Sequence, residues 1–400
     1  MSKIKVVITG MGAVTPLGND LSTTWTELIH GKSSQRPVTL FDVSQCRCQS
    51  ACEAQLPSLP VNSKTMSRLS RASRLTIPAA QEALAQAGLS SVSFLPISLS
   101  TTGGGMTLGE TFLKKVLTHK KGNLLGLVAR YQPQQQLLDL QEQLRVSGPS
   151  MIVANACASG ANAIGHAYDM IQTGQTDYVL TGGAEALTEL IFVGFDCLQA
   201  ASTEACRPFD KNRSGLILGE AAAFLVLESE AYAQKRGAKI LAEIIGYGHS
   251  TDVHHLTQPA PQGHALVQAM QSACESAKIN PQEIHYINAH GTGTPLNDAA
   301  ETASFTNFFG QTLAQTKISS TKAQIGHTLG AAGAIEAIFA TKTLMHQQLP
   351  TQINLKNPIP EIASSLATSS RCSQTVHTTM SVNLGFGGSN AALIFRSYVN

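Results

Sequence analysis

The sequence has little net charge, few aromatic side chains and no long apolar run, and these absences exclude several classes of protein. Lys and Arg number 28 against 26 Asp and Glu, so the formal charge is only +2. Because the basic residues are spread along the chain, no strong field favours nucleic acid or an anionic membrane surface. No segment approaches the roughly 20 apolar residues of a membrane span, and the apolar run in MSKIKVVITGMG is too short for a signal-peptide core. We therefore expect neither a nucleic-acid nor a membrane partner.

Cysteine is present but forms no disulfide framework. Eight cysteines are scattered over 400 residues, and a chain of this length buries enough surface to fold without covalent staples. This usage is typical of a reducing compartment, so we predict a cytoplasmic protein. Cys46, Cys48 and Cys52 lie close together, but no fourth ligand follows at zinc-finger spacing. Surface or part-buried thiols are therefore favoured over a metal site there.

Strand-like and helix-like segments alternate along the whole chain. A β-rich run at 4–9 ends in a glycine turn, and helical periodicity covers 68–87 up to the stop signal Gly88. Such alternation predicts an α/β architecture whose helices cover a largely parallel sheet. The opening IKVVITGMGAVTPLGND is echoed by KILAEIIGYGHSTD, which suggests two similar halves, 1–238 and 239–400.

A candidate nucleophile lies in PSMIVANACASGANAIGHAYDMIQTG. A strand-like run at 151–154 leads through a small-residue turn into a helical pattern over about 158–173, and Cys157 is at the helix start. Backbone N–H groups and the positive end of the helix dipole favour a thiolate there, so we predict a thiol pKa below the usual value of about 8.5. Taken alone, Cys157 is at least as consistent with a small buried side chain.

Three further motifs carry polar or conformationally special residues. INAHGTGTPLNDAAE places His290 at the end of a strand, where sites in α/β proteins gather. SSTKAQIGHTLGAAGAIEAIFATKTL contains Lys322 and His327 before a helix with a face of small residues, and Glu336 in that helix can balance Lys322. VNLGFGGSNAALIF surrounds Phe386 with glycines, whose permissive backbone can present an N–H group to a reacting carbonyl.

These motifs follow the order found in the elongating β-ketoacyl-(acyl carrier protein) synthases, and nearly the whole chain resembles the type II, single-domain form of that family. The anchors are ACASG with Cys157, AHGTGT with His290, TKAQIGH with Lys322 and His327, GAAGAIEA with Glu336, and GFGGSN with Phe386. The resemblance implies the thiolase fold, in which two similar βαβαβαββ halves stack into a five-layer αβαβα sandwich. It also implies a dimer.

The resemblance implies a reaction as well. Cys157 would carry the acyl chain, with the N–H groups of Cys157 and Phe386 as the oxyanion hole, and His290 and His327 would stabilise the enolate left by decarboxylation of malonyl carrier protein. The implied supporting residues are Lys322 and Glu336 as an ion pair holding the His327 loop, Thr292 and Thr294 as contacts of the phosphopantetheine arm, and Phe386 as a gate. We expect no metal and no redox cofactor, because the thioester activates the carbonyl and decarboxylation supplies the carbanion.

The partner implied by the resemblance is an acyl carrier protein. Such proteins are acidic, so an enzyme of near-neutral charge needs a local basic patch to bind one. Basic residues recur every three or four positions at Lys64, Arg68, Arg71 and Arg74, and on one helix they would form a band. Arg207 matches another position that contacts carrier protein in the family. The alternative for the band is an ordinary solvated helix face.

Departures from the family pattern concern the substrate. The segment 122–148 differs from the usual lid-and-interface segment, and position 384 is leucine where phenylalanine is common. Met106 and Leu108 lie where family members shape the acyl tunnel across the dimer interface. The acyl length stays open, as does the choice between a homodimer and a heterodimer with a chain-length-factor-like homologue in a polyene or polyketide pathway.

Other classes fit the motifs less well. A thiolase would need a second active cysteine in the late turn, where Gly387 and Gly388 stand. An initiating synthase would carry Cys–His–Asn. A Cys–His thioester hydrolase explains Cys157 and one histidine but gives no purpose to the second histidine or to Lys322. A non-catalytic scaffold would acquire no acyl group at Cys157.

Overall fold

Ten strands form one continuous sheet in the computed structural model, which describes residues 3–119, 122 and 124–399. The spatial order is β5-β4-β6-β7-β1 in the first half and β10-β9-β11-β12-β8 in the second. In each half the first three of these strands run parallel, and the last two are antiparallel to their neighbours. One topology therefore occurs twice, and the strands that begin the two copies, β1 and β8, lie in the two segments whose sequences echo one another. The sheet is mixed, where the sequence predicted a largely parallel one.

The strands have the following bounds. The first half contains β1 (Val6–Val14), β4 (Ile97–Ser100), β5 (Ser150–Val153), β6 (Tyr178–Glu185) and β7 (Ala221–Ser229). The second half contains β8 (Ala242–Thr251), β9 (Tyr286–Asn288), β10 (Lys317–Ser319), β11 (Thr378–Leu384) and β12 (Ser389–Arg396). A separate short pair, β2 (Arg36–Pro37) and β3 (Ser50–Ala51), lies in an otherwise loop-like segment.

The helices lie between these strands. The α-helices are α1 (Leu21–Ile29), α2 (Ser63–Met66), α3 (Arg71–Ala87), α4 (Met106–Leu117), α5 (Leu124–Tyr131), α6 (Gln134–Leu144), α7 (Ser159–Gln172), α8 (Glu189–Cys197), α9 (Glu230–Lys235), α10 (His264–Ala277), α11 (Pro295–Phe309), α12 (Lys322–Ile325) and α13 (Ala332–His346). Short 3₁₀ turns are η1 (Ala156–Ala158), η2 (Pro281–Glu283), η3 (Gly310–Gln315), η4 (Leu329–Ala331) and η5 (Pro360–Ile362). None of the helices in the described ranges combines the length and apolarity that crossing a membrane requires.

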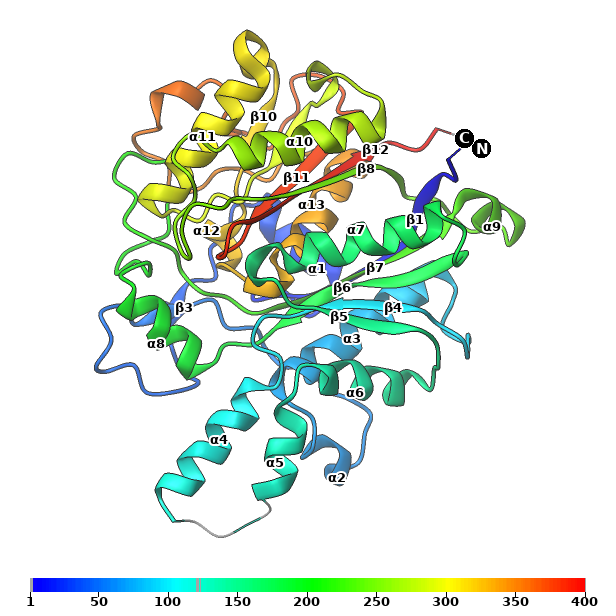
Figure 1. Cartoon of the computed structure of the whole chain (residues 1–400), viewed down its shortest axis with the longest axis vertical. Coiled ribbons are helices and arrows are strands. Elements are labelled where there is room, and N and C mark those ends of the chain that lie inside the picture. The colour runs from blue at the N-terminus through cyan, green and yellow to red at the C-terminus, as the bar shows by residue number, and fades with distance from the viewer. Residues whose placement is uncertain (1–2, 120–121, 123, 400) are drawn as a thin grey trace.

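Two helices lie between the half-sheets and form the central layer of the molecule (Figure 1). Helix α7 contacts β4 and β6 of the first half and β8 and β12 of the second, while α13 contacts β9 and β11 as well as β6 and β7. Helices α3 and α6 cover the outer face of the first half-sheet, and α10 and α11 cover that of the second. This order of layers is the αβαβα sandwich that the resemblance implied.

Burial explains the composition of the central elements. Every residue of β1, β7 and β11 is buried, as expected of strands covered on both faces. Helix α13 is buried around nearly its whole circumference, so it is apolar on all sides rather than amphipathic. By contrast, α4 contains no buried residue, and together with α5 it projects from the body at the bottom of Figure 1.

The two halves join through the antiparallel pair β1–β8, in which Val6 lies opposite Ile244. The boundary predicted at 238/239 falls in the connection between α9 and β8. The helix predicted over 68–87 begins three residues later, at Arg71, because Ser70 caps it by accepting the N–H of Ser73. Its predicted stop at Gly88 is confirmed, since this residue adopts a left-handed φ of +71°.

Candidate active site

A sharp turn between β5 and α7 presents Cys157. Ala156, the residue before it, has a φ of +57°, a left-handed conformation that is strained for a residue with a side chain. Ser159 stabilises the turn, since its hydroxyl donates to the carbonyl oxygen of Ala156 over 2.5 Å and accepts the N–H of Asn155 over 2.8 Å. The thiol therefore sits in η1, at the N-terminal end of α7 as predicted.

An equivalent turn in the second half carries His327. There η4 precedes α13, and Leu329 repeats the left-handed backbone with a φ of +47°. The two central helices cross at glycines: a Cβ added at Gly160 would lie 2.6 Å from the backbone nitrogen of Ala334, and one at Gly333 would lie 2.3 Å from that of Ala161. The small residues of both helices allow this close packing, which brings the N-terminal ends of α7 and α13 together.

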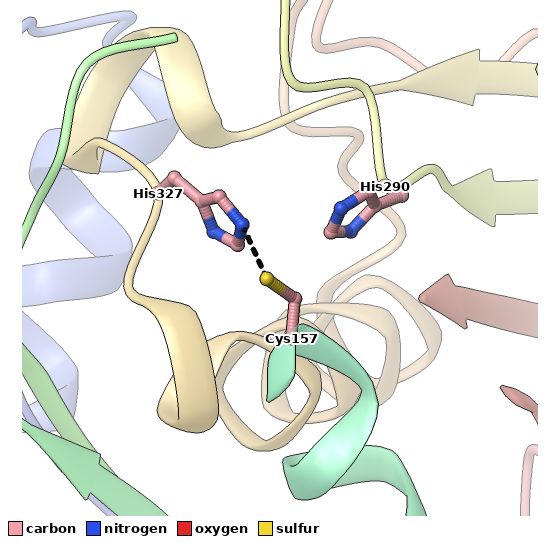
Figure 2. Close-up of side chains that lie close together, drawn as sticks. All are labelled: Cys157, His290 and His327. Carbon is pink, nitrogen blue, oxygen red and sulfur yellow. Dashed lines mark hydrogen bonds between the residues drawn. The ribbon is translucent and has the colours of Figure 1, made fainter. Parts of the chain in front are cut away.

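Cys157, His290 and His327 converge at this crossing (Figure 2). Nε2 of His327 lies 3.0 Å from Sγ of Cys157, and one ligand atom from each of the three side chains lies within 4.8 Å of the others. The two imidazole rings are 5.1 Å apart between centroids and nearly perpendicular, at 84°. All three side chains are buried. A small carbonyl compound bound here would contact the sulfur and both rings.

The hydrogen bonds of the histidines define what they can donate. The N–H of Leu329 donates to Nδ1 of His327 over 3.3 Å, so the neutral ring carries its proton on Nε2, facing the sulfur. Nδ1 of His290 is buried and has no hydrogen-bond partner in the described ranges. Burial, reinforced by the nearby Lys322, holds the pKa of both imidazoles well below their usual 6.5. Both rings are therefore neutral near pH 7.

The predicted low pKa of Cys157 is wrong. Burial raises the pKa of its thiol to about 12, although Lys322 and a hydrogen bond from the N–H of Phe386 favour the thiolate. The sequence showed that Cys157 lies at a helix start, but it did not show that the thiol is buried away from water. The loss of solvation of the thiolate outweighs the contacts that stabilise the thiolate. Before reaction the pair is therefore a neutral thiol beside a neutral imidazole.

Lys322 and Glu336 form a buried ion pair between α12 and α13, with 1% and 2% of their side-chain surfaces exposed. The ammonium group also donates to the carbonyl oxygen of His290 over 2.5 Å, and the second carboxylate oxygen accepts from the amide of Asn383 over 2.6 Å. This network ties the His290 loop to α13. The predicted ion pair with Glu336 is present, but the direct loop contact of Lys322 is with the His290 loop, where the prediction named the His327 loop.

Two buried carboxylates that the sequence analysis missed hold the loops of the site. Glu301 accepts the N–H groups of His290 and Gly291 over 2.6 and 2.7 Å, and burial raises its pKa to about 8. Glu185 accepts backbone N–H groups from Thr102 and Gly103 in the loop before α4 and from Gly330 in η4, and burial raises its pKa to about 7. Glu301 closes the INAHGTGTPLNDAAE motif, but neither residue shows a spacing that marks it in sequence.

Phe386 lies in the loop between β11 and β12, beside Cys157. Its side chain stacks on Phe195 of α8, with centroids 5.5 Å apart. Gly387 and Gly388 adopt left-handed φ values of +82° and +86°, and a Cβ at Gly388 would lie 2.0 Å from the carbonyl oxygen of Asp252. The backbone conformation therefore favours glycine at both positions, and close packing requires it at Gly388 as well. The loop places the N–H of Phe386 at the sulfur.

A cavity of about 290 Å³ opens from Cys157 to the surface. Thr292 and Thr294 line it, with their hydroxyl groups 2.9 Å apart, and so does the segment 252–259, which the sequence analysis did not single out. Met106 and Leu108 are not among the residues that line it. They lie at the start of α4, and their predicted role at an acyl tunnel stays a prediction.

The predicted basic band is interrupted. Lys64 lies in α2 and Arg68 in the following turn, and both are exposed, whereas α3 begins only at Arg71. Arg71 donates from Nε and Nη2 to the two carboxylate oxygens of the buried Glu220, both over 2.6 Å. Including Arg71 in a docking band is therefore wrong, because its guanidinium is used inside the fold.

The other members of the docking set differ in their environment. Arg74 is half-buried within α3, and Arg207 is half-buried and paired with Glu204. The clustered thiols Cys46, Cys48 and Cys52 are free, the last two buried, and in the described ranges they do not form a group of three closely spaced ligand atoms.

Comparison with known proteins gives one consistent result. A family model described as the N-terminal domain of β-ketoacyl synthase matches residues 3–233, and its C-terminal counterpart matches residues 241–356. The chain is similar to 3-oxoacyl-[acyl-carrier-protein] synthase 2 of Staphylococcus aureus (strain MRSA252), with 36% identity over 408 residues and 99% of each chain covered. Among solved structures, the ishigamide ketosynthase/chain length factor superposes with a TM-score of 0.92 at 30% identity, covering 100% of both chains. A chain of the AntDE:AntF structure, in which a type II polyketide acyl-carrier protein is in complex with its ketosynthase, superposes with a TM-score of 0.89 at 25% identity, covering 99% of this chain and 100% of the other.

Proposed function

Because this chain belongs to the β-ketoacyl synthase family and is a condensing enzyme of the acyltransferase class, we propose the following reaction for its site. An acyl chain held on Cys157 condenses with malonyl-acyl carrier protein, giving β-ketoacyl carrier protein and carbon dioxide. The observation that carries the proposal is the approach of one thiol to two neutral imidazoles in a buried cavity. A hydrolase would have no use for the second ring.

Acyl transfer comes first. The sulfur of Cys157 attacks the thioester carbonyl of the acyl carrier protein, the carbon–sulfur bond to phosphopantetheine breaks, and the thiol proton moves to the departing sulfur. The developing oxyanion is stabilised by the N–H groups of Cys157 and Phe386. This exchange consumes no net proton, so a thiol that is neutral beforehand is compatible with it.

Decarboxylation follows in the same cavity. The malonyl carboxylate leaves as carbon dioxide, and the electron pair of the broken bond forms an enolate on the thioester. The N–H groups of His290 and His327 donate to the enolate oxygen, and the exclusion of water strengthens both bonds. Lys322, Glu336 and Glu301 act on this step by holding the two histidine loops in place.

Condensation completes the cycle. The carbanion attacks the Cys157 thioester, the bond to sulfur breaks, and the released thiolate takes a proton from solvent. In this scheme the thioester supplies carbonyl activation and decarboxylation supplies the nucleophile, so the proposal includes no metal and no redox cofactor. Thr292 and Thr294 are proposed to bind the phosphopantetheine arm, and Phe386 to gate the two half-reactions.

The proposed partner is an acyl carrier protein in the cytoplasm. Support comes from the carrier protein in the AntDE:AntF structure and from the exposed Lys64 and Arg68, with Arg74 and Arg207 as further basic contacts. A charge pattern of this kind is expected to steer an acidic partner to the enzyme.

A second candidate is the ketosynthase subunit of a heterodimer in polyene or polyketide synthesis. It is favoured by the ishigamide ketosynthase/chain length factor, which matches over the full length of both chains. Condensation with acyl primers of graded length, with and without a candidate partner, separates the two candidates. Full activity as a homodimer would remove the reason for the second.

The test of the reaction uses two variants. Cys157→Gln is expected to abolish acyl transfer while keeping or raising malonyl decarboxylation, because the enolate donors remain. His290→Ala is expected to lose decarboxylation and still form the acyl-enzyme, detected by mass spectrometry. Normal decarboxylation by His290→Ala would contradict the assigned role.

A further inference from the structure

Glu185, the last residue of β6, is buried among hydrogen-bond donors. One carboxylate oxygen accepts the N–H of Thr102 over 2.6 Å and that of Gly330 over 3.0 Å. The other accepts the N–H of Gly103 over 2.7 Å and the hydroxyl of Thr101 over 3.3 Å. Only a carboxylate satisfies four donors in this way, since the amide of glutamine would turn an N–H₂ group toward one pair of them.

These donors belong to two segments that are far apart in the chain. Thr101, Thr102 and Gly103 belong to the loop that leads into α4, whereas Gly330 lies in η4, between His327 and α13. In the same turn the N–H of Leu329 donates to Nδ1 of His327. Glu185 thus holds Gly330, the residue next to Leu329, whose N–H orients the His327 ring.

Close backbone contacts join the two segments to each other and to β6. A Cβ added at Gly330 would lie 2.5 Å from the backbone nitrogen of Thr102, and one added at Gly183 would lie 3.0 Å from the carbonyl oxygen of Gly330. The hydroxyl of Thr102 also donates to the carbonyl oxygen of Ala156 over 3.4 Å, which connects the loop to the Cys157 turn.

We propose that Glu185 is a positioning residue for decarboxylation: by clamping the 101–103 loop to η4, it holds His327 in the geometry in which Nε2 donates to the enolate oxygen. Glu185 does not contact the reacting atoms and acts through Leu329 and His327. The inference rests on the proposed function, which assigns His327 to this half-reaction.

The experiment compares two half-reactions in one variant at pH 8, where Glu185 is mainly ionised because burial raises its pKa only to about 7. Glu185→Gln is expected to reduce malonyl decarboxylation about 10- to 100-fold, the scale of a small misplacement of a catalytic group. Acyl transfer to Cys157, followed by intact mass, is expected to change much less, because its oxyanion donors are the N–H groups of Cys157 and Phe386. Glu185→Asp, which keeps the charge, should recover part of the decarboxylation.

Glu82 provides the matched control. It is a half-buried carboxylate that also accepts backbone N–H groups, from Ala13 over 2.9 Å and from Leu21 over 3.0 Å. Glu82→Gln should also remove a carboxylate that accepts backbone N–H groups, but it should not change the ratio of the two half-reactions, because Glu82 contacts neither histidine loop. An equal fall of both half-reactions in Glu185→Gln, or the same change of ratio in Glu82→Gln, would overturn the inference.

A crystal structure of Glu185→Gln tests the inference without activity. Nε2 of His327 is expected to move out of hydrogen-bond distance of the Cys157 sulfur. If that contact stays at 3.0 Å, the positioning role is wrong whether or not the enzyme decarboxylates malonyl carrier protein. Failure of the wild-type protein to decarboxylate would instead contradict the proposed function.

Discussion

Nε2 of His327 donates toward Sγ of Cys157 over 3.0 Å, although the two residues are 170 positions apart in the chain. The N–H of Leu329 occupies Nδ1 of the same ring, so the proton faces the sulfur. In a site this dry the pair stays uncharged, since burial disfavours both the thiolate and the imidazolium. The nucleophile is thus held ready by position rather than by ionisation.

The rate of Cys157 alkylation is expected to keep rising with pH up to pH 9.5, without reaching a plateau. With its pKa raised to about 12 by burial, the reactive thiolate fraction should grow about tenfold for each pH unit between 7 and 9.5. The measurement is peptide-resolved mass spectrometry after brief iodoacetamide treatment, with the exposed Cys197 as a reference for reagent delivery. A plateau below pH 9 would show that the helix start does lower the pKa.

In malonyl decarboxylation by Cys157→Gln, the two imidazoles are expected to cause no step between pH 8 and pH 6.5, whereas the loop-holding carboxylates Glu301 and Glu185, whose pKa values burial raises to about 8 and about 7, take up protons in this window and weaken the activity as the pH falls. Burial lowers the pKa of His290 and His327 well below 6.5, so neither ring changes its charge in this window. Because the pKa of these histidines is lower in the folded protein than in the unfolded chain, the unfolded chain takes up protons at a higher pH than the folded protein does. Stability from these two groups is thus complete above pH 6.5 and is lost as the pH falls. Carbon dioxide release is measured in Cys157→Gln and in Cys157→Gln/Glu185→Gln, alongside a thermal melt of each. A step in carbon dioxide release centred near pH 6.5 that remains when Glu185 is replaced would contradict the assignment of neutral rings.

Breaking the Lys322–Glu336 pair should destabilise the fold strongly. Lys322→Ala leaves an unpaired buried carboxylate, at a cost of about 3–5 kcal/mol in the free energy of unfolding. The double variant Lys322→Met/Glu336→Gln should cost less, because no charge is buried and the amide still accepts from Asn383. Urea unfolding of the single and double variants measures both. Equal losses would mean that the pair contributes through its shape alone.

Substitutions of Arg68 and Arg71 should have different effects, one on carrier-protein binding and the other on stability. Arg68→Ala is expected to raise KM for carrier-bound substrate about two- to fivefold, the scale of an exposed charge contact, without changing the melting temperature. Arg71→Ala should instead destabilise the fold by about 3–5 kcal/mol, since it strands the buried carboxylate of Glu220. The matched readouts are melting curves and KM for carrier-bound and short thioesters. A rise in KM for both substrates would exclude docking as the role of Arg68.

Local sequence was sufficient for several features of the site. The helix start at α7 follows from small residues after a strand, and the stop of α3 follows from Gly88, because these depend on neighbouring residues alone. The repeated topology was also visible, since β1 and β8 carry similar strand-and-turn sequences. The prediction of a basic band was wrong because spacing shows only which residues would share a helix face. It does not show that Ser70 starts a new helix or that Arg71 pairs with Glu220.

Sequence by itself determined which chemical groups this protein has and the order in which they follow turns and strands, including Cys157, His290 and His327. Tertiary structure alone decided their protonation and support, because burial is a property of the packed molecule. Desolvation raised the pKa of the thiol, and long-range contacts selected Glu185 and Glu301 to hold the loops. Neither effect can be predicted from the spacing of neighbouring residues. The groups that bury the thiol and contact Glu185 and Glu301 come from strands and helices that meet only when the two halves pack on α7 and α13.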